Sequence, residues 1–369
     1  MSEWKEVTLD NIADVRDGTH DSPKQQDEGE YLITSRHIKN GKIDFSSAYK
    51  ISIIDYNEVN RRSKVDKWDV LFSMIGTIGE MTIVDFEPKF AIKNIGLFKT
   101  NGNSELAKWI YYYFKSDEAK AEINASLKGS TQQYITLGDL RRFPFILPPL
   151  PEQKAIAGVL SSLDDKIDLL HRQNKTLEAM AEALFLQWFV EEASDDWEVI
   201  TIDDIAYVST GKGLKKEEYL EYGKYPVLGA NGVIGRTDKY LFSKDDNIMI
   251  TGRVGTHGKV FLINKMVWVS DNALIIKPKE HHFRYVLYFI LKGLDYASLN
   301  VGSTQPLITQ TDIKKVELQT VDGLFESFDK IVLPLFENIE ENINQIYSLE
   351  KLRDTLLPKL MSGEVRVME

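Results

Sequence analysis

The stretch Leu147-Pro-Pro-Leu-Pro-Glu-Gln153 opens the segment that decides the fold. Three prolines are incompatible with a central β-strand, whereas Pro151 suits the first turn of a helix. From there to about Val190, apolar residues recur in alternating steps of four and three, which is typical of a coiled-coil helix. At 1.5 Å per residue the predicted helix is about 55–60 Å long. A helix this long with one apolar stripe needs a second helix to cover it.

A second stripe of the same kind lies 172 positions further along the chain. In the first helix, heptad position a holds Leu160, Ile167, Asn174, Ala181 and Trp188, and position d holds Ile156, Leu163, Leu170, Leu177 and Leu184. In the second, position a holds Val332, Ile339, Ile346, Arg353 and Leu360, and position d holds Phe328, Leu335, Asn342, Leu349 and Leu356. We therefore expect the two helices to pair antiparallel.

One alignment of the two stripes places Asn174 opposite Asn342, the only asparagines in the seam. A buried amide pair costs stability but fixes the register, because any slip would leave an amide against leucine. The alternative is that both amides are half-exposed and bind water. The same alignment sets Arg353 against leucine, so we expect its head group to reach out to water. Pro334 and Pro358 should kink or cap the second helix.

The globular parts of the chain are duplicated as well. Three blocks recur in the same order, namely Trp4–Val15 with Trp197–Val208, Gly76–Gly79 with Gly255–Gly258, and Gly129–Thr136 with Gly302–Thr309. Two copies of a domain followed by a helix indicate a pseudo-symmetric protein rather than a solenoid. The predicted organisation is a first domain over 1–150, a central helix over 151–195, a second domain over 196–322 and a C-terminal helix over 323–369.

Each domain reads as a mixture of short strands and one amphipathic helix, so the fold class is α+β. The clearest strand segments are short, apolar and bounded by turn residues; they are Asp69–Ile75, Met81–Val84, Ile248–Thr251 and Lys259–Ile263. The expected helices, both rich in aromatic residues, cover Leu106–Lys115 and His282–Lys292.

Composition narrows the class of protein. The 369-residue chain has a net charge of −11 and no cysteine. Disulfides and thiolate metal sites are thereby excluded, and a reducing cytoplasm is the expected compartment. No signal peptide is expected, and no apolar run approaches the roughly 18 residues of a membrane span. The acidic excess lies mainly in the two helices, so the near-neutral domains can still present local basic patches.

Catalytic motifs are missing from the sequence. Gly252-Arg-Val-Gly-Thr-His-Gly-Lys259 resembles a phosphate-binding loop, but its spacing is wrong and Val260 stands where serine or threonine is required. A turn between two strands is the better interpretation. The six histidines lack the spacing of a zinc-binding pair, and His281-His282 is expected to open a surface helix. We therefore predict neither a catalytic nor a metal site.

Three stretches carry a resemblance to one known family. They are the Leu-Pro-Pro-Leu-Pro-Glu-Gln-x-x-Ile-Ala run before the long helix, the paired Gly-Ser-Thr-Gln…Ile-Thr blocks, and the ending Leu352-Arg-x-Thr-Leu-Leu-Pro-Lys-Leu-Met-Ser-Gly-Glu364. Together, and over essentially the whole chain, they resemble the specificity subunit of type I restriction–modification systems.

The resemblance implies both architecture and function. It implies two target-recognition domains held apart by an antiparallel pair of helices, each domain reading one half of a bipartite site in double-stranded DNA. It implies a non-catalytic subunit that binds no cofactor itself. Two modification methyltransferase subunits would dock on the helices and bind S-adenosylmethionine, and two restriction subunits that use ATP and Mg²⁺ can join.

The candidate DNA contacts are polar and basic residues in predicted loops. Arginine can read guanine, and glutamine can read adenine. The candidates are Arg36, His37, Lys39, Arg61, Arg62, Lys64, Gln132, Gln133, Lys212, Lys215, Lys216, Arg253, His257 and Gln305. Each could equally be a solvated or turn-stabilising residue. Gln132 and Gln305 occupy equivalent positions in the two copies, which favours a shared structural role over base reading.

Other surfaces leave alternatives open. The pairs Arg141-Arg142 and Lys314-Lys315 are equivalent and could touch phosphate or a partner. Glutamates at 178, 182, 337, 340 and 341 lie off the seam, most simply as a solvated face. Leu169, Phe185 and Phe189 also lie off the seam, for docking or for packing on a domain. The rival functions are a non-DNA scaffold with two protein-binding modules, and the specificity subunit of a system whose partner fuses methyltransferase and nuclease.

Overall fold

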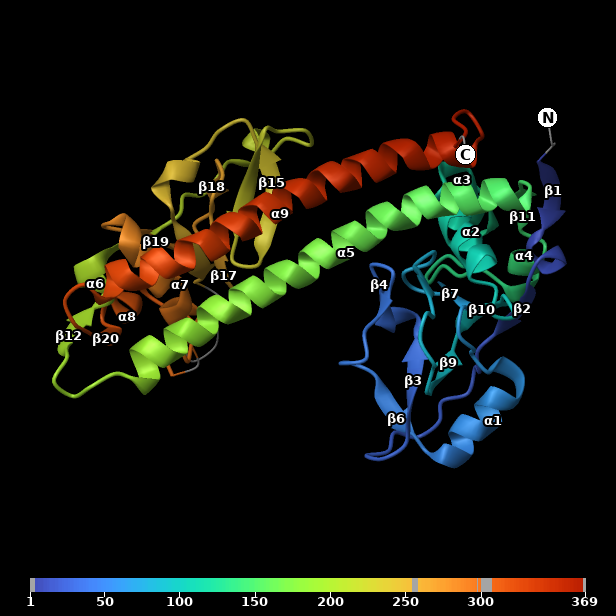
Figure 1. Cartoon of the computed structure of the whole chain (residues 1–369), viewed down its shortest axis with the longest axis horizontal. Coiled ribbons are helices and arrows are strands. Elements are labelled where there is room, and N and C mark those ends of the chain that lie inside the picture. Colours follow the sequence, from blue (N-terminus) through green and yellow to red (C-terminus); the bar gives the residue numbers. More distant parts are fainter. Residues whose placement is uncertain (1–3, 254–257, 297, 300–306, 368–369) are drawn as a thin grey trace. The chain divides into compact units, whose positions relative to one another are not determined.

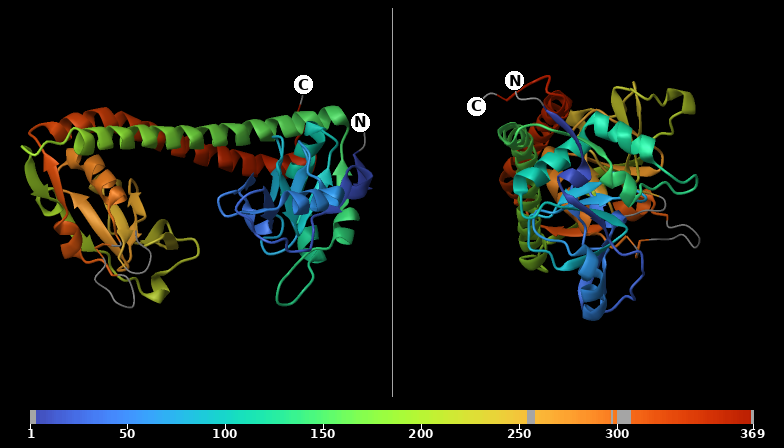
Figure 2. Two further views of the ribbon diagram at one scale, coloured as in Figure 1. Left: turned by 90° about the horizontal axis from the view of Figure 1, so that it is seen from below. Right: turned by 90° about the vertical axis from the view of Figure 1, so that its right-hand side faces the viewer.

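The computed structural model describes residues 4–253, 258–296, 298–299 and 307–367. The chain divides into two compact units, one formed by residues 1–169 with 345–369 and the other by residues 170–344. Each unit combines short β-sheets with helices, as the ribbons in Figure 1 and Figure 2 show, so the fold is α+β with two domains. No helix in the described part of the chain is both long and apolar enough to cross a membrane.

The first domain is built on three sheets. A two-stranded sheet pairs β1 (Lys5–Thr8) with β11 (Pro144–Leu147). A four-stranded sheet has the order β2 (Asp14–Asp17), β10 (Ile95–Lys99), β7 (Val70–Ser73), β8 (Met81–Ile83). A three-stranded sheet has the order β6 (Tyr49–Ile51), β3 (Glu30–Thr34), β9 (Phe90–Lys93). A small hairpin of β4 (Ile38–Lys39) and β5 (Lys42–Ile43) accompanies α1 (Ile53–Ser63), α2 (Ser104–Lys115), α3 (Asp117–Ser126) and α4 (Leu137–Arg141).

The second domain repeats the same three sheets in the same order. The two-stranded sheet pairs β12 (Glu198–Thr201) with β20 (Glu317–Thr320). The four-stranded sheet has the order β13 (Ala206–Thr210), β19 (Ala273–Pro278), β16 (Met249–Gly252), β17 (Val260–Leu262). The three-stranded sheet has the order β15 (Gly232–Thr237), β14 (Tyr225–Gly229), β18 (Trp268–Val269). Its helices are α6 (Ile202–Ile205), α7 (Arg284–Gly293) and α8 (Gln310–Lys314). The shared strand order confirms that the sequence repeat is a structural repeat.

The predicted strands and the two aromatic helices are confirmed, as β7, β8, β16 and β17 and as α2 and α7. His281 and His282 form a short 3-10 turn that leads into α7, as expected. The prediction of one amphipathic helix per domain is wrong for the first domain, because α1 and α3 are additional. α1 escaped detection because most of its residues are polar and its two isoleucines are exposed, Ile53 at 52% and Ile54 at 81%; its contact with the core comes from the partly buried Tyr56 and Val59.

The two long helices are α5 (Leu150–Leu186), which continues into a π-turn at Gln187–Glu191, and α9 (Leu324–Met361). Within the second unit they run antiparallel in the predicted register. Asn342 Nδ2 donates to Asn174 Oδ1 at 2.8 Å, and the rings of Trp188 and Phe328 lie 6.1 Å apart. The amide pair is half-buried rather than fully enclosed. α9 continues unbroken through Pro334 and ends three residues after Pro358.

Arg353 differs from the prediction. Its guanidinium group does not reach out to water but donates to Asp164 Oδ1 of α5 at 2.8 Å and also pairs with Asp354. These carboxylates raise the pKa of Arg353 further above its ordinary value despite the opposing effect of burial. The heptad pattern does not predict this contact, because it places only the seam residue Leu163 opposite Arg353 and not the neighbouring Asp164.

Both helices enter the domain cores. In the first unit Ile156, Ala157 and Leu160 of α5 are buried together with Leu357 and Leu360 of α9. In the second, the rings of Phe185 and Phe189 pack against Phe328, so these two residues belong to the domain core.

Leu169 is exposed, whereas the α5 glutamates Glu178 and Glu182 have partners in the second domain. Leu169 stays 40% exposed. Glu178 and Glu182 are not merely solvated, because Lys292 of α7 donates to them at 2.9 Å and 2.8 Å, and the Tyr288 hydroxyl donates to Glu178.

The threonines of the repeated Ile-Thr blocks cap helices in both copies. Thr136 and Thr309 are the N-caps of α4 and α8, and each hydroxyl accepts from the backbone N–H three residues later, at 3.1 Å and 3.2 Å. The aspartates at those positions, Asp139 and Asp312, bond back to the threonine N–H groups and complete a capping box. This part of the repeat therefore starts a helix in both copies.

Candidate nucleic-acid interface

The first candidate segment, Arg36 to Lys39, is a 3-10 turn followed by β4. Successive side chains of a 3-10 turn point about 120° apart, and here Arg36 is exposed whereas the next residue, His37, is fully buried, with 0% of its surface accessible; Lys39, in β4, is exposed. The Thr34 N–H donates to His37 Nδ1 at 2.9 Å. Burial, assisted by the charge of Arg36, lowers the pKa of His37 below its ordinary value. His37 is thus a core residue and cannot contact DNA in this conformation, which corrects its place among the candidates.

Lys39 pairs with an acidic residue that directly follows β5. Its Nζ lies 3.2 Å from Asp44 Oδ2. Hydrogen bonds from Ser46 and Lys39 lower the pKa of Asp44 to about 2.

The basic run at residues 61–64 closes helix α1. Basic side chains are favourable at a helix C-terminus because the macrodipole is negative there. Each of the three also has an acidic partner: Arg61 with Glu58 at 2.8 Å, Lys64 with Asp66 at 2.8 Å, and Arg62 with Asp17 in a short contact. All three remain largely exposed, at 63% or more of the side chain.

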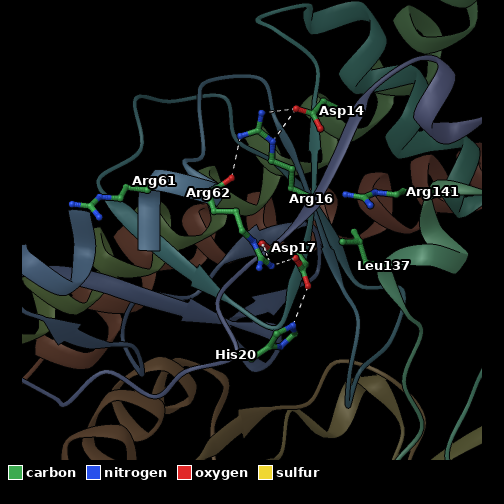
Figure 3. Close-up of a pocket in the computed structure, with 8 residues that line it drawn as sticks. All are labelled: Asp14, Arg16, Asp17, His20, Arg61, Arg62, Leu137 and Arg141. Atoms are coloured by element: carbon green, nitrogen blue, oxygen red, sulfur yellow. Dashed lines mark hydrogen bonds and ion pairs between the residues drawn. The ribbon is translucent and has the colours of Figure 1, made fainter. Parts of the chain in front are cut away.

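Two members of this run line a groove that the sequence did not reveal. A cavity of about 650 Å³ lies between β2, the end of α1 and helix α4, as Figure 3 shows. It is lined by Asp14, Arg16, Asp17, His20, Arg61, Arg62, Leu137 and Arg141. We call it the arginine groove. Four arginines against two carboxylates give it a net positive charge within an acidic chain.

The arginine groove is ordered by hydrogen bonds. Arg16 donates from Nε to Asp14 Oδ2 at 2.8 Å and from Nη1 to the Arg62 carbonyl at 3.0 Å. Arg62 donates from Nη2 to Asp17 Oδ1, and the other Asp17 oxygen lies 3.1 Å from His20 Nε2. Asp17 is only 5% exposed, whereas Arg62 is 63% exposed. A buried carboxylate therefore holds an exposed guanidinium group (Figure 3).

The loop with Gln132 and Gln133 is a separate exposed feature. Lys128 and Tyr134 exchange two backbone hydrogen bonds of 2.9 Å and close the loop, and Gly129 has a positive φ of 90°. A Cβ at position 129 would lie 2.3 Å from the Gln132 carbonyl, so glycine is required there. Both glutamine side chains are exposed. Gln305, the equivalent in the second copy, lies outside the described residues.

In the second domain Lys212, Lys215 and Lys216 are exposed. The backbone around them is fixed, since the Trp268 Nε1–H donates to the Lys212 carbonyl at 2.8 Å and a 3-10 turn begins at Lys216. Arg253 is half-exposed, and its backbone bonds to Asn272 and Ile308. His257 lies outside the described residues. The rejected phosphate loop connects antiparallel β16 and β17, so it does not precede a helix as a phosphate loop would.

Of the residues that line the arginine groove, Arg141 was a candidate contact from the sequence, whereas Arg16, Asp17 and His20 were not predicted. The available signal was a difference between the copies. At the end of β2 the first copy has Arg16 and Asp17 where the second, at the end of β13, has Ser209 and Thr210. Charged residues in one copy of a repeat and neutral ones in the other mark a place where the copies can differ in binding. Among the described residues there is no cluster of histidine and acidic side chains that could hold a metal ion.

Comparison with known proteins agrees with this architecture. The chain matches the family "Type I restriction modification DNA specificity domain" over residues 1–179 and again over 194–322. It is 29% identical over 307 residues to the type I restriction enzyme MjaIX specificity subunit of Methanocaldococcus jannaschii, covering 72% of this chain and 70% of that protein. It is 25% identical to a putative type I specificity subunit of Mycoplasma genitalium, covering 97% and 93%.

A solved structure shares the fold. The crystal structure of a type I restriction–modification S subunit from M. genitalium superposes with a TM-score of 0.63 at 21% identity, covering 97% of this chain and 96% of that one. The family match spans most of the chain and includes both repeats. This chain therefore belongs to the type I restriction modification DNA specificity domain family.

Proposed function

We propose that each of the two domains reads one half of a bipartite site in double-stranded DNA, so that the chain gives a type I restriction–modification complex its sequence specificity. The observation that carries this proposal is the duplicated unit, which has the same three sheets in both copies and a family match on each. Two similar domains with different surface residues suit two different half-sites.

The chain supplies specificity rather than catalysis. Chemistry on a base within duplex DNA requires the base to be flipped into a pocket, and we assign that pocket to a partner. We propose that two methyltransferase subunits dock on the helical region formed by α5 and α9 and bind S-adenosylmethionine. Restriction subunits that use ATP and Mg²⁺ would join the same complex.

Exposed apolar side chains on the helices support a docking role. On α9, Tyr347 is 68% exposed and Leu352 is 47% exposed in the first unit, while Ile331 and Ile343 are 46% and 50% exposed in the second. On α5, Met180 is 50% exposed. Apolar residues on helix faces away from the domain cores are typical of protein–protein contacts.

The test is methylation-sensitive sequencing of DNA from cells that co-express this chain with its modification subunit. The expected result is a split, asymmetric motif with methylated adenine in both halves, lost when this chain is omitted. Replacing residues 1–150 by the corresponding domain of a relative should change only one half of the motif.

Two kinds of result would contradict the proposal, and a third would only change the type of system. Methylation without this chain would show that another subunit reads the site. A domain replacement that alters both halves, or neither, would contradict the assignment of one half to each domain. A partner subunit that carries both methyltransferase and nuclease would identify the fused type of system, with the same role for this chain.

A further inference from the structure

The arginine groove has a shape that suits the DNA backbone better than the base edges. Base edges lie recessed in the DNA grooves, so a protruding helix, strand or loop reads them. The phosphodiester chain is convex, and a concave surface can enclose it. The planar fork of arginine matches the oxygens of a phosphate group, and its charge cannot be removed by deprotonation.

The arginines of the groove are not repeated at the described, equivalent positions of the second domain. The positions equivalent to Arg16 and Asp17 hold Ser209 and Thr210. Arg141 corresponds to Lys314, whose Nζ pairs with Asp203 at 2.8 Å. Arg61 and Arg62 have no equivalent, because residues 225–252, all within the described part, contain no helix longer than the three-residue turn Lys244–Asp246.

Asp17 organises the groove from beneath. It is buried on β2, its side chain accepts from Arg62, and it faces His20 as well. An exposed arginine without a partner would sample many rotamers, and ordering it on binding costs free energy. A carboxylate that holds it in place removes part of that cost, at the expense of one opposing charge.

We propose that the arginine groove seats the phosphodiester backbone of the DNA that the first domain reads, with Asp17 as a positioning residue for Arg62. This inference rests on the proposed function. It assigns to the first domain an anchor for affinity whose arginines have no counterpart at the described positions compared in the second domain, and it separates this anchor from the residues that read bases.

The experiment uses the purified complex of this chain with its modification subunit. Binding is measured by fluorescence anisotropy over a series of salt concentrations. One DNA duplex contains the sequence motif found by methylation-sensitive sequencing, and the other is a scrambled duplex of the same length. Arg62→Ala should weaken binding to both duplexes by about tenfold and reduce the slope of log K against log salt by about 0.9, as for one lost phosphate contact. The methylated motif should stay the same.

Lys120→Ala is the matched control. Lys120 of α3 is 58% exposed and pairs with a carboxylate, Asp117, but it does not line the groove. The variant removes the same charge from the same domain at a site outside the groove, and we expect a much smaller effect on binding. An equal effect would show that only general charge matters and would overturn the proposal.

The Asp17→Asn variant tests positioning, because the two explanations predict opposite signs. If the groove acted only through its total charge, removing a carboxylate should strengthen DNA binding, as should Asp85→Asn at an exposed site elsewhere in the domain. If Asp17 positions Arg62, Asp17→Asn should weaken binding. In an Arg62→Ala background, Asp17→Asn should then have little further effect, and this coupling also excludes a general loss of folding.

The remaining outcomes are distinct. Loss of affinity for the motif duplex alone, with a relaxed motif, would mean that Arg62 reads a base and would overturn the backbone assignment. Loss of assembly with the modification subunit, with normal DNA binding by the assembled fraction, would mean that the groove binds protein. If the motif depends on this chain but all groove variants bind normally, only the groove proposal fails. If the motif does not depend on this chain, the proposed function fails.

Discussion

At the scale of single residues, the clearest energetic feature is a buried ion pair in the first domain. Asp69, directly before β7, is 0% exposed, and Lys99, at the end of β10, donates to it at 2.7 Å. Lys99 also pairs with Asp66, and the Thr100 N–H donates to Asp69. Burial raises the pKa of Asp69 above its ordinary value, although the hydrogen bond from Lys99 opposes the shift.

Lys99→Met should destabilise the first domain by about 3–5 kcal/mol, because it leaves a buried carboxylate without its partner. The loss should depend on pH. The pKa of Asp69 is raised in the folded state, and it rises further when Lys99 is removed. Between the ordinary and the raised pKa, Asp69 is therefore protonated in the folded domain but ionised in the unfolded chain. The free energy of unfolding consequently falls as pH increases through that range. Urea unfolding should therefore show a larger loss at neutral than at mildly acidic pH. The control is Asp69→Asn with Lys99→Met, which should recover part of the loss; a double variant as unstable as the sum of the two would contradict this explanation.

At the scale of secondary-structure elements, the asparagine pair between α5 and α9 makes a sharp prediction. Asn342→Leu should destabilise the protein by about 1–3 kcal/mol, because Asn174 then loses its amide partner in a half-buried seam. Changing both residues to leucine should restore or increase the unfolding free energy in urea while weakening the control of register.

Register can be measured directly because the chain has no cysteine. A cysteine pair at Ala181 and Leu335, which face each other in the predicted register, should cross-link efficiently in the wild-type background. Cross-linking should become less efficient with the double leucine change. Equal efficiency in both backgrounds would show that the asparagines do not set the register.

The outer face of α9 gives a second prediction at this scale. Tyr347→Glu should weaken co-purification with the modification subunit by at least about tenfold, since tyrosine is a frequent hot-spot residue and a charge there is costly to desolvate. Ile54→Glu on α1, at a residue that is 81% exposed, is the matched control and should assemble normally. Unchanged assembly of the Tyr347 variant would place the docking surface elsewhere.

The elements were the most predictable part of this protein. Heptad spacing predicted both long helices and the Asn174–Asn342 contact, because a seam of two helices is almost a one-dimensional problem. α1 was missed because its sequence is mostly polar and the face that packs on the core has only two apolar residues, Tyr56 and Val59. The arginine groove was missed because it joins β2, α1 and α4, which are far apart in sequence. The burial of His37 was missed because it stands in a polar run, where nothing in the sequence shows that its side chain is buried while that of its neighbour Arg36 is exposed.

At the scale of the whole molecule, the first unit is built from two distant parts of the chain, residues 1–169 and 345–369. Leu357, Leu360 and Met361 of α9 are buried in the same core as Ile156 and Leu160 of α5. Removing residues 345–369 would take Leu357, Leu360 and Met361 out of this core and expose Ile156 and Leu160 to water, at roughly 25 cal/mol per Å² of apolar surface.

Truncation after Asn344 should therefore make the first domain much more sensitive to protease than the second. Limited proteolysis followed by mass spectrometry would map the cleavage sites, with the second domain as the internal control. Equal resistance of the first domain with and without residues 345–369 would show that it folds without its C-terminal segment.

Because the first unit is formed by two separate segments of the chain, its folding during synthesis must wait for the second segment. Residues 4–169 are made long before residues 345–369, which cover part of their core. At about 5–20 residues per second, the delay is on the order of ten seconds or more. Throughout that time Ile156 and Leu160 lack the covering they have in the finished protein. The first domain to emerge is thus the last to be completed, and a chaperone or a waiting partner subunit has its best opportunity to bind during this interval.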